Sequence, residues 1–202
     1  SESRTAPRTP RRAAATAGAR SLQSEIKALL EPFGSPALGV SRDVAAAVDE
    51  KCAALAKSAR PPPLDALQGR WKVLYSNAPS PSNGALGPFR GDAVQAVDVA
   101  RRKYTNELNL GPLTVALEAS FTGDERELRV AFETIRLDLF GNTVLDKAFP
   151  AGVERTWVLC YTDDNTRIVR AGVDGGRSLV REAGLVSGGE AKDAYLFYME
   201  RE

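Results

Sequence analysis

Few residue types in this chain could carry out chemistry. It has no histidine, and its two cysteines, Cys52 and Cys160, are far apart and lack CxxC spacing. Imidazole is the commonest general base near neutral pH and the commonest metal ligand. A Ser-His-Asp site, a Cys-His site and a zinc cluster are therefore excluded. Catalysis by carboxylates, lysine or tyrosine stays open, and we expect the cysteines to be small buried hydrophobes rather than a redox pair.

The acidic motifs do not form a recognisable site. The run from Asp163 to Asn165 lacks the alternating oxygen ligands and distal glutamate of an EF-hand loop, so it predicts a hairpin turn. Residues 172–176 lack the strand-then-helix context of a phosphate loop. Nothing in the sequence brings Asp138 and Asp146 together as a catalytic pair. We expect no catalytic residue, no metal and no required cofactor.

Aromatic and amide side chains could instead bind an apolar molecule. Gly69 opens a segment that carries Trp71 and Tyr75 on one face, because successive side chains of a strand alternate. The residues expected to line such an interior are Trp71, Tyr75, Gln95, Phe121, Phe132 and Trp157. The other interpretation is a filled core, in which amides such as Gln95 and Asn106 bond to backbone, since an unsatisfied one costs about 1–3 kcal/mol.

Trp71 has a second candidate role, which is to close one end of this interior. An arginine across the indole face would contribute about 0.5–2 kcal/mol as a cation–π contact. Arg170 is the first candidate for that arginine, because it lies on a late strand, and Arg167 is the other. The residues expected to close the structure are therefore Gly69, Trp71, Arg167 and Arg170.

Strands are the main elements that must position these residues. From Leu67 onward polar and apolar residues alternate, and clusters of Gly, Pro, Asn and Asp separate the segments. We expect strands near residues 70–76, 93–99, 102–109, 113–121, 127–135, 155–162, 166–171, 177–182 and 193–200. Short strands with no helices between them predict a mainly β fold, and the Gly-x-Trp opening favours an antiparallel barrel of about eight strands over a sandwich.

Two short helices are expected before the strands. The first has an apolar face that contains Ile26 and ends near Pro32. Ser41 is a candidate N-cap for the second. Its apolar stripe is predicted to dock on the rest of the domain and consists of Val44, Val48, Cys52, Leu55 and Ala59. No apolar run approaches the roughly 18 residues of a membrane helix, so we expect no membrane span.

The N-terminal residues differ in composition from the rest. Residues 1–20 hold five arginines and one glutamate, a local net charge of +4 in a chain of +1, which leaves −3 for the remainder. This composition is typical of a transit-peptide remnant, or of a disordered basic arm. The mildly acidic net charge of residues 21–202 argues against nucleic-acid binding. We divide the chain into an arm (1–20), a helical segment packed on the barrel (21–63) and the barrel (64–202).

The connection 136–154 is the most apolar loop that the sequence predicts. Its apolar residues are Leu137, Leu139, Phe140, Leu145 and Phe149. Exposed apolar patches usually mark interaction sites. We interpret this loop either as a lid over the barrel or as a docking surface.

Three motifs in order resemble a known family. They are Gly69-x-Trp71 with the strand that follows, residues 94–98 with Asn106, and Tyr161 with Asp163, Asp164, Arg167 and Arg170. Across about residues 21–182 the chain is similar to the plastid lipid-associated proteins, or fibrillins. The resemblance implies a lipocalin-like barrel at the thylakoid or plastoglobule surface of the plastid, which binds a carotenoid, a prenylquinone or an acyl lipid.

Two hypotheses about function follow. The first is a non-catalytic carrier of such an apolar molecule, with the barrel interior as its site and the 136–154 connection as its gate. The alternative is a structural subunit attached to a thylakoid photosynthetic complex, with a packed barrel and no ligand. A lipid-acting enzyme is disfavoured because no catalytic constellation is recognisable.

Overall fold

The computed structural model describes residues 10–58, 61–172 and 194–202. It is mainly β, with 51% strand and 23% helix, as the sequence predicts. Two helices, α1 (Pro10–Leu30) and α2 (Arg42–Ser58), are joined through the 3-10 turn η1 (Glu31–Phe33), and η2 (Leu64–Leu67) leads into the strands. The strands are β1 (Gly69–Ser76), β2 (Ala85–Leu86), β3 (Phe89–Arg90), β4 (Asp92–Asp98), β5 (Lys103–Leu110), β6 (Leu113–Gly123), β7 (Glu127–Leu139), β8 (Asn142–Ala148), β9 (Glu154–Thr162), β10 (Thr166–Gly172) and β11 (Ala194–Arg201).

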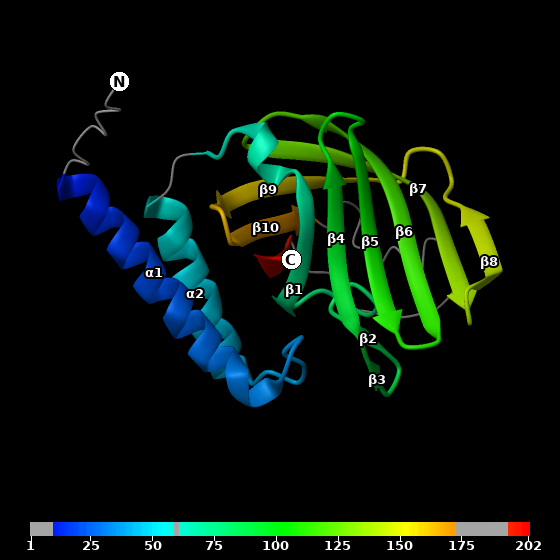
Figure 1. Ribbon diagram of the computed structural model, residues 1–202, viewed down its shortest axis with the longest axis horizontal. Helices are drawn as coiled ribbons and strands as arrows, with labels where there is room; N and C mark the ends of the chain where they lie inside the picture. Colours follow the sequence, from blue (N-terminus) through cyan, green and yellow to red (C-terminus); the bar gives the residue numbers. More distant parts are fainter. Residues whose placement is uncertain (1–9, 59–60, 173–193) are drawn as a thin grey trace, which may run out of the picture.

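A large antiparallel sheet closes into a ring (Figure 1). Its order is β6-β5-β4-β1-β11-β10-β9-β7, and a β6–β7 pairing joins the two ends. Strand β8 pairs with β7 alone and lies outside this ring. The first part of β7 pairs with β9, whereas residues 134–139 pair with β8. The second half of β7 therefore separates from β9, stays paired with β6 and carries β8 away from the helices.

The apolar side chains form two cores on opposite faces of the sheet. One fills the ring and includes Trp71, Tyr104 and Trp157. The other lies between the helices and the outer face of β1, β9, β10 and β11, on the left side of Figure 1, and includes Ile26 and Tyr198. Because the sheet buries both faces in this region, β10 has four consecutive buried residues, Thr166 to Val169.

The second helix docks as its sequence pattern predicts. Val48, Cys52 and Leu55 are buried against the strands. The Ser41 hydroxyl accepts a hydrogen bond from the Val44 amide at 3.4 Å, which confirms the predicted cap. Ala59, the last residue of the predicted stripe, lies outside the described residues. None of the helices in the described ranges has the length and apolarity to cross a membrane.

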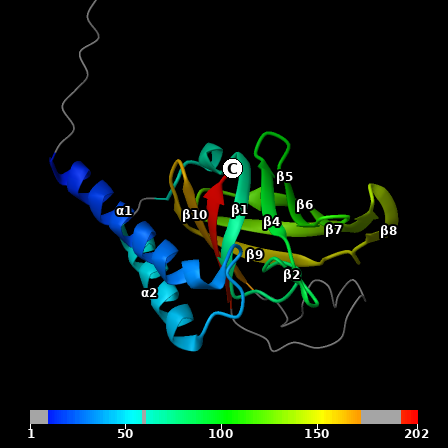
Figure 2. The ribbon, with the colours of Figure 1, turned by 60° about the horizontal axis from the view of Figure 1, so that its bottom comes forward.

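Polar contacts fix the helices to the outer face of the ring. Arg170 donates to Asp49 of α2 at 2.7 Å. Gln23 of α1 donates to Asp163 at 2.7 Å, and the Tyr161 hydroxyl donates to the same carboxylate. Helix α1 begins at Pro10, so residues 10–20 of the expected arm are helical here, and residues 1–9 lie outside the described part (Figure 2).

A β-bulge overturns the predicted direction of Tyr75. Val73 pairs with Met199 and Tyr75 with Tyr198, so Leu74 is an extra residue in the ladder. A bulge inserts one residue and shifts the side-chain alternation to the other face. Tyr75 therefore joins the helix-facing core, not the ring interior. There it borders a solvent-open groove of about 1,020 Å³ between α2 and the end of β1.

The connection 136–154 is not a loop. Strand β7 continues to Leu139, a tight turn at Phe140 and Gly141 follows, and β8 returns to Ala148. The sequence interpretation missed β8 because its exposed residues show no apolar alternation that a core would require. Each predicted strand from 70–76 to 166–171 has a counterpart in the structure, and so does the predicted strand 193–200. The predicted strand 177–182 lies outside the described residues.

Candidate binding site inside the strand ring

The structure brings most of the predicted interior residues together. Trp71, Phe121, Phe132 and Trp157 are buried in the ring core. Gln95 is 1% exposed and shares the inward alternation of its β4 neighbours Ala93 and Val97. Tyr75 is the exception, for the reason given above.

One end of the ring is closed around Trp71. The indole nitrogen donates to the Leu67 carbonyl of η2 at 3.0 Å, which fixes the ring plane. The guanidinium of Arg201 lies 4.1 Å from the indole centroid, and that of Arg167 lies 6.0 Å from it. Arg170, the first predicted partner, points outward to α2 and was therefore a wrong choice.

Arg201 is the residue that the sequence interpretation missed. Besides covering Trp71, it donates to the carbonyls of Asp164, Gln68 and Ala66 at 2.8, 2.7 and 3.0 Å. It is directly opposite Trp71 in the β1–β11 register. No local signal could have identified it, because the pairing joins the first and last strands of the ring along the sequence.

Gly69 makes room for this closure. Its φ is +119°, which a residue with a side chain rarely adopts, and a Cβ there would lie 2.9 Å from Nη1 of Arg201. Glycine is free to adopt such angles because it has no Cβ. Of the predicted closing group, Gly69 and Trp71 lie at this end, Arg167 lies 6.0 Å from the indole centroid, and Arg201 rather than Arg170 covers the indole.

Three polar groups inside the ring lack hydrogen-bond partners among the described residues. They are the whole guanidinium of Arg167, both amide atoms of Gln95 and the indole nitrogen of Trp157. Arg167 is 0% exposed. Buried polar groups are almost always paired, and an unpaired buried charge is among the most costly features of a protein. These groups therefore need hydrogen-bond partners other than the described residues around them.

Backbone register shows that these groups are neighbours. Trp71 is opposite Gln95, and Gln95 is opposite Asn106, across β1, β4 and β5. Arg167 is opposite Met199, which is in turn opposite Val73. Inward residues on paired strands are in contact or nearly so. Gln95 and Arg167 thus lie on the two sides of Trp71.

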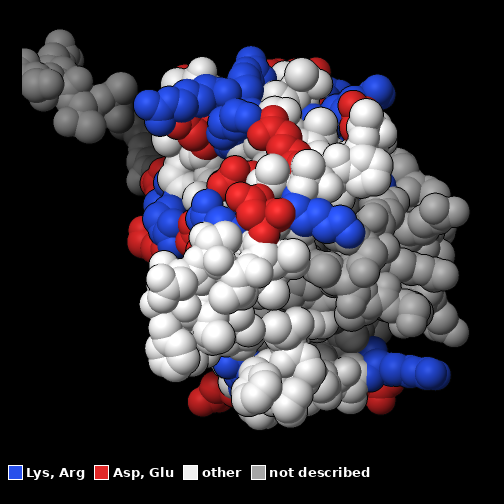
Figure 3. Space-filling view, turned by 90° about the vertical axis from the view of Figure 1, so that its right-hand side faces the viewer, with Lys and Arg blue, Asp and Glu red and all other residues white. Residues whose placement is uncertain are grey.

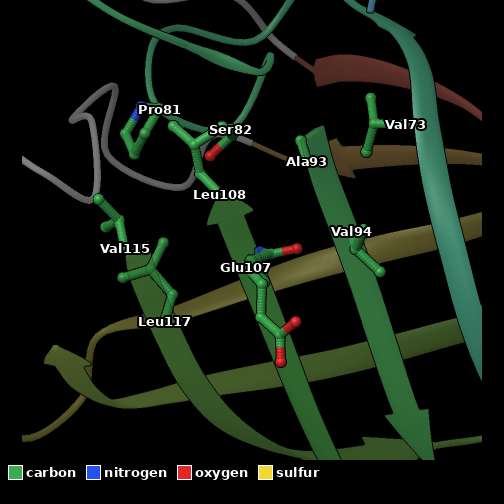
Figure 4. A pocket seen from close by; sticks show the side chains of 10 residues that line it. Val73, Pro81, Ser82, Ala93, Val94, Glu107, Leu108, Val115 and Leu117 are labelled. Atoms are coloured by element: carbon green, nitrogen blue, oxygen red, sulfur yellow. The ribbon is translucent and has the colours of Figure 1, made fainter. Parts of the chain in front are cut away.

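A small pocket lies beside strands β1, β4, β5 and β6, and none of Gln95, Trp157 and Arg167 lines it. Its cavity volume is about 10 Å³, which is room for about one water molecule. Figure 4 shows Val73, Ala93, Leu108, Val115 and Leu117 on strands β1, β4, β5 and β6, with Pro81 and Ser82 of the following loop above them. Asn106 also lines the pocket, and it accepts a hydrogen bond from the Tyr104 hydroxyl at 3.1 Å.

The interior has a positive charge at its closed end. Burial lowers the pKa of Arg167, the neighbouring Tyr104 raises it, and Arg201 lowers it; no carboxylate is among these influences. An arginine remains protonated in proteins even so. Burial also raises the pKa of Tyr104, which therefore stays neutral and can donate a hydrogen bond. The ring interior combines one buried cation with neutral amide groups, and the pocket beside them is lined by apolar residues together with Asn106 and Glu107.

The other polar motifs have structural partners. Asp163 accepts bonds from the amides of Asn165 and Thr166 at 2.9 and 2.7 Å, which confirms the predicted turn. Asp138 binds Arg136 and Thr143. In the portions of the chain that the structure describes, no three metal-binding side chains gather.

No protein-family model, curated protein or solved structure matches this chain.

Proposed function

We propose that this protein is a non-catalytic carrier that binds an apolar molecule inside the strand ring. The ring would then be a lipocalin-like barrel with one closed and one open end. The observation that carries this proposal is a small apolar recess of about 10 Å³, whose walls include Val73, Ala93, Leu108, Val115 and Leu117 and must move apart to admit a ligand. Ligand pockets are typically apolar with a few convergent polar groups. Asn106 at the pocket and Gln95 beside it supply such groups.

Uptake of a neutral apolar probe tests the carrier proposal. N-phenyl-1-naphthylamine should bind with about one probe per chain, and its fluorescence should rise. Ala93→Leu should abolish binding, because Ala93 is buried and faces the pocket. Ala131→Phe, on the outward alternation of β7, is the matched control and should bind normally. Absence of saturable uptake by the folded wild-type protein would contradict the proposal.

The resemblance to the plastid lipid-associated proteins supports a location for this carrier. The motifs around Trp71, Asn106 and Tyr161 indicate that family, and they lead us to propose a peripheral protein of the thylakoid or plastoglobule surface. An organic extract of the protein purified from plastid membranes should then contain an isoprenoid or acyl lipid. An extract without any such molecule, from a monomeric protein, would count against the assignment.

A specific surface favours a second candidate function, that of a docking subunit. The β7–β8 hairpin projects from the ring and exposes Leu139, Phe140 and Val144, with Phe140 77% exposed. Figure 3 faces this side and shows a broad area without charged side chains between charged groups above and below. Such a patch would suit attachment to a photosynthetic membrane complex. Co-migration with a large complex, lost on replacement of Phe140, would establish this function.

A further inference from the structure

The groove between α2 and the end of β1 is a second place where this protein has room for a ligand. Its volume is about 1,020 Å³ with the open mouth included, and water-sized atoms can occupy about 480 Å³ of it. On the same basis the pocket beside β1, β4, β5 and β6 has only about 10 Å³. Small residues form much of the groove lining, which is why it stays open: Ala37, Gly39, Ala45, Ala46 and Ala78. A small molecule can therefore enter this groove without the rearrangement that the ring pocket requires.

Tyr75 contributes an unpartnered hydroxyl to the groove. The residue is 4% exposed and lines the groove, and its hydroxyl makes no hydrogen bond to any described residue. Burial, and then the nearby Asp49 and Cys52, raise the pKa of this phenol, so it keeps its proton near neutral pH. Buried polar side chains are almost always hydrogen-bonded. Tyr75 is thus a donor for which the described residues supply no acceptor.

The uncharged polar side chains beside Tyr75 also present donors to the groove. The side-chain oxygen of Asn77 accepts a hydrogen bond from a backbone amide at 2.8 Å, and that of Asn83 accepts one at 3.0 Å. The hydroxyl oxygen of Ser76 likewise accepts a backbone amide at 3.0 Å. Because these bonds use the oxygens, the NH₂ groups of both asparagines and the hydroxyl proton of Ser76 remain to donate. The groove is therefore suited to a ligand rich in acceptors.

The charges of the groove favour an anionic ligand. Arg42, the first residue of α2, lines the groove and has no ion-pair partner among the described residues. The start of a helix also carries the positive end of its dipole, which favours a phosphate there. Asp49 is the only carboxylate among the described lining residues, and Arg170 neutralises it at 2.7 Å.

We propose that this groove binds a phosphate monoester of a small organic molecule. The phosphate accepts hydrogen bonds from Tyr75 and its neighbours and pairs with Arg42, while the organic group contacts the apolar lining residues Leu38, Val40 and Leu196. A phosphate monoester has three acceptor oxygens and about −1.5 to −2 charges, which fits several donors better than a carboxylate does. The occupiable volume is typical of sites for small molecules. This site is separate from the ring interior and does not depend on the carrier function.

Calorimetric titration of the full chain in phosphate-free buffer tests the proposal. The ligands are phenyl phosphate, inorganic phosphate and benzyl alcohol. Phenyl phosphate should bind with about one molecule per chain, and ~10-fold or more tightly than either of the others. The alcohol lacks the charge-assisted hydrogen bonds, and inorganic phosphate lacks the apolar contacts.

Two pairs of variants test whether binding occurs in the groove. Tyr75→Phe removes only the unpartnered hydroxyl and should weaken phenyl phosphate binding ~10-fold. Tyr195→Phe makes the same change against the ring core and should leave the affinity unchanged. Ala46 is exposed and lines the groove, so Ala46→Glu adds a repelling carboxylate there and should also weaken binding ~10-fold. Ala46→Lys, of similar size, should not weaken it.

The source of the ester is tested with vesicles of phosphatidylcholine that contain phosphatidate. Saturable binding of phenyl phosphate supports a soluble ester, whereas groove-dependent binding of these vesicles alone assigns the phosphate to a lipid head group. Failure of the wild-type protein to bind either one overturns the proposal. So does equal affinity for inorganic phosphate, or an equal effect of each variant and its control. If Tyr75→Phe does not fold, the comparison of Ala46→Glu with Ala46→Lys decides the question.

Discussion

The guanidinium of Arg201 lies 4.1 Å from the centroid of the Trp71 ring, although 130 positions separate the two residues in sequence. They face each other in the β1–β11 ladder, where the last described strand meets the first one of the ring. The β1–β11 pairing is one of the strand pairings that form the ring, and at the same position the side chain of Arg201 covers Trp71 and closes one end of the interior. The stability of the fold should therefore depend strongly on these two side chains.

Loss of Arg201 should destabilise the fold. Arg201→Met removes the cation–π contact and the three hydrogen bonds to the carbonyls of Ala66, Gln68 and Asp164. We expect the free energy of unfolding to fall by about 2 kcal/mol or more, measured by urea denaturation. Arg170→Met is the matched control, because its ion pair with Asp49 is partly exposed and should be worth at most ~1 kcal/mol. Equal effects of the two changes would contradict the closing role of Arg201.

A side chain at position 69 should be poorly tolerated. Gly69→Ala forces alanine to a φ of +119° and places its Cβ 2.9 Å from Nη1 of Arg201. We expect a loss of about 1–3 kcal/mol. Gly111→Ala, at a φ of +77° with open space around it, should cost less because only backbone strain remains. The thermal midpoints of the two variants measure the difference, and a larger loss at position 111 would refute this account.

Removal of the Arg167 charge should stabilise the ligand-free protein. The buried guanidinium has no hydrogen-bond partner among the described residues, so Arg167→Met removes a desolvated charge and keeps most of the side-chain volume. We expect the free energy of unfolding to rise by about 1–3 kcal/mol in delipidated protein. A clear loss of stability without ligand would show that Arg167 is structural.

The tip of the β7–β8 hairpin should accept asparagine. Phe140 has a φ of +49° and Gly141 one of +76°, a pair of angles that favours Asn-Gly in a two-residue turn. Phe140→Asn should therefore raise stability by up to ~1 kcal/mol in thermal unfolding. Val144→Asn is the control: it makes the same apolar-to-polar change at an exposed strand position and should not stabilise. A less stable Phe140→Asn variant would indicate that the phenylalanine packs against something in the folded protein.

Alkaline pH should lower the free energy of unfolding, because the thiol of Cys52 ionises more readily in the unfolded chain. Burial raises the pKa of this thiol from 9.0 to about 12. Between these values the unfolded chain loses the proton while the folded chain keeps it, so stability falls as pH rises, by up to about 1.4 kcal/mol per pH unit. Below pH 9 the thiol contributes no pH dependence. Cys52→Ala should reduce the slope of unfolding free energy against pH in this window, and identical slopes would rule out the buried thiol as a cause.

Elements that depend on local pattern could be predicted from the amino-acid sequence. Period-two alternation identified the strands of the ring, because one face of each must be apolar. The cap at Ser41 and the turn at Asp163 were also predictable, since their hydrogen bonds join residues at most three positions apart. The inward positions of Trp71, Gln95, Phe132 and Trp157 followed from the same alternation.

Two features required the three-dimensional structure: the face of the sheet on which a side chain lies after a β-bulge, and the identity of contact partners far apart in sequence. The bulge at Leu74 reverses Tyr75, and no residue type signals it. Arg201 rather than Arg170 covers Trp71 because the ladder register joins strands far apart in sequence. That Arg167 is buried without a partner among the described residues likewise became visible only in the assembled ring, because the pairing of a charge depends on every strand that surrounds it.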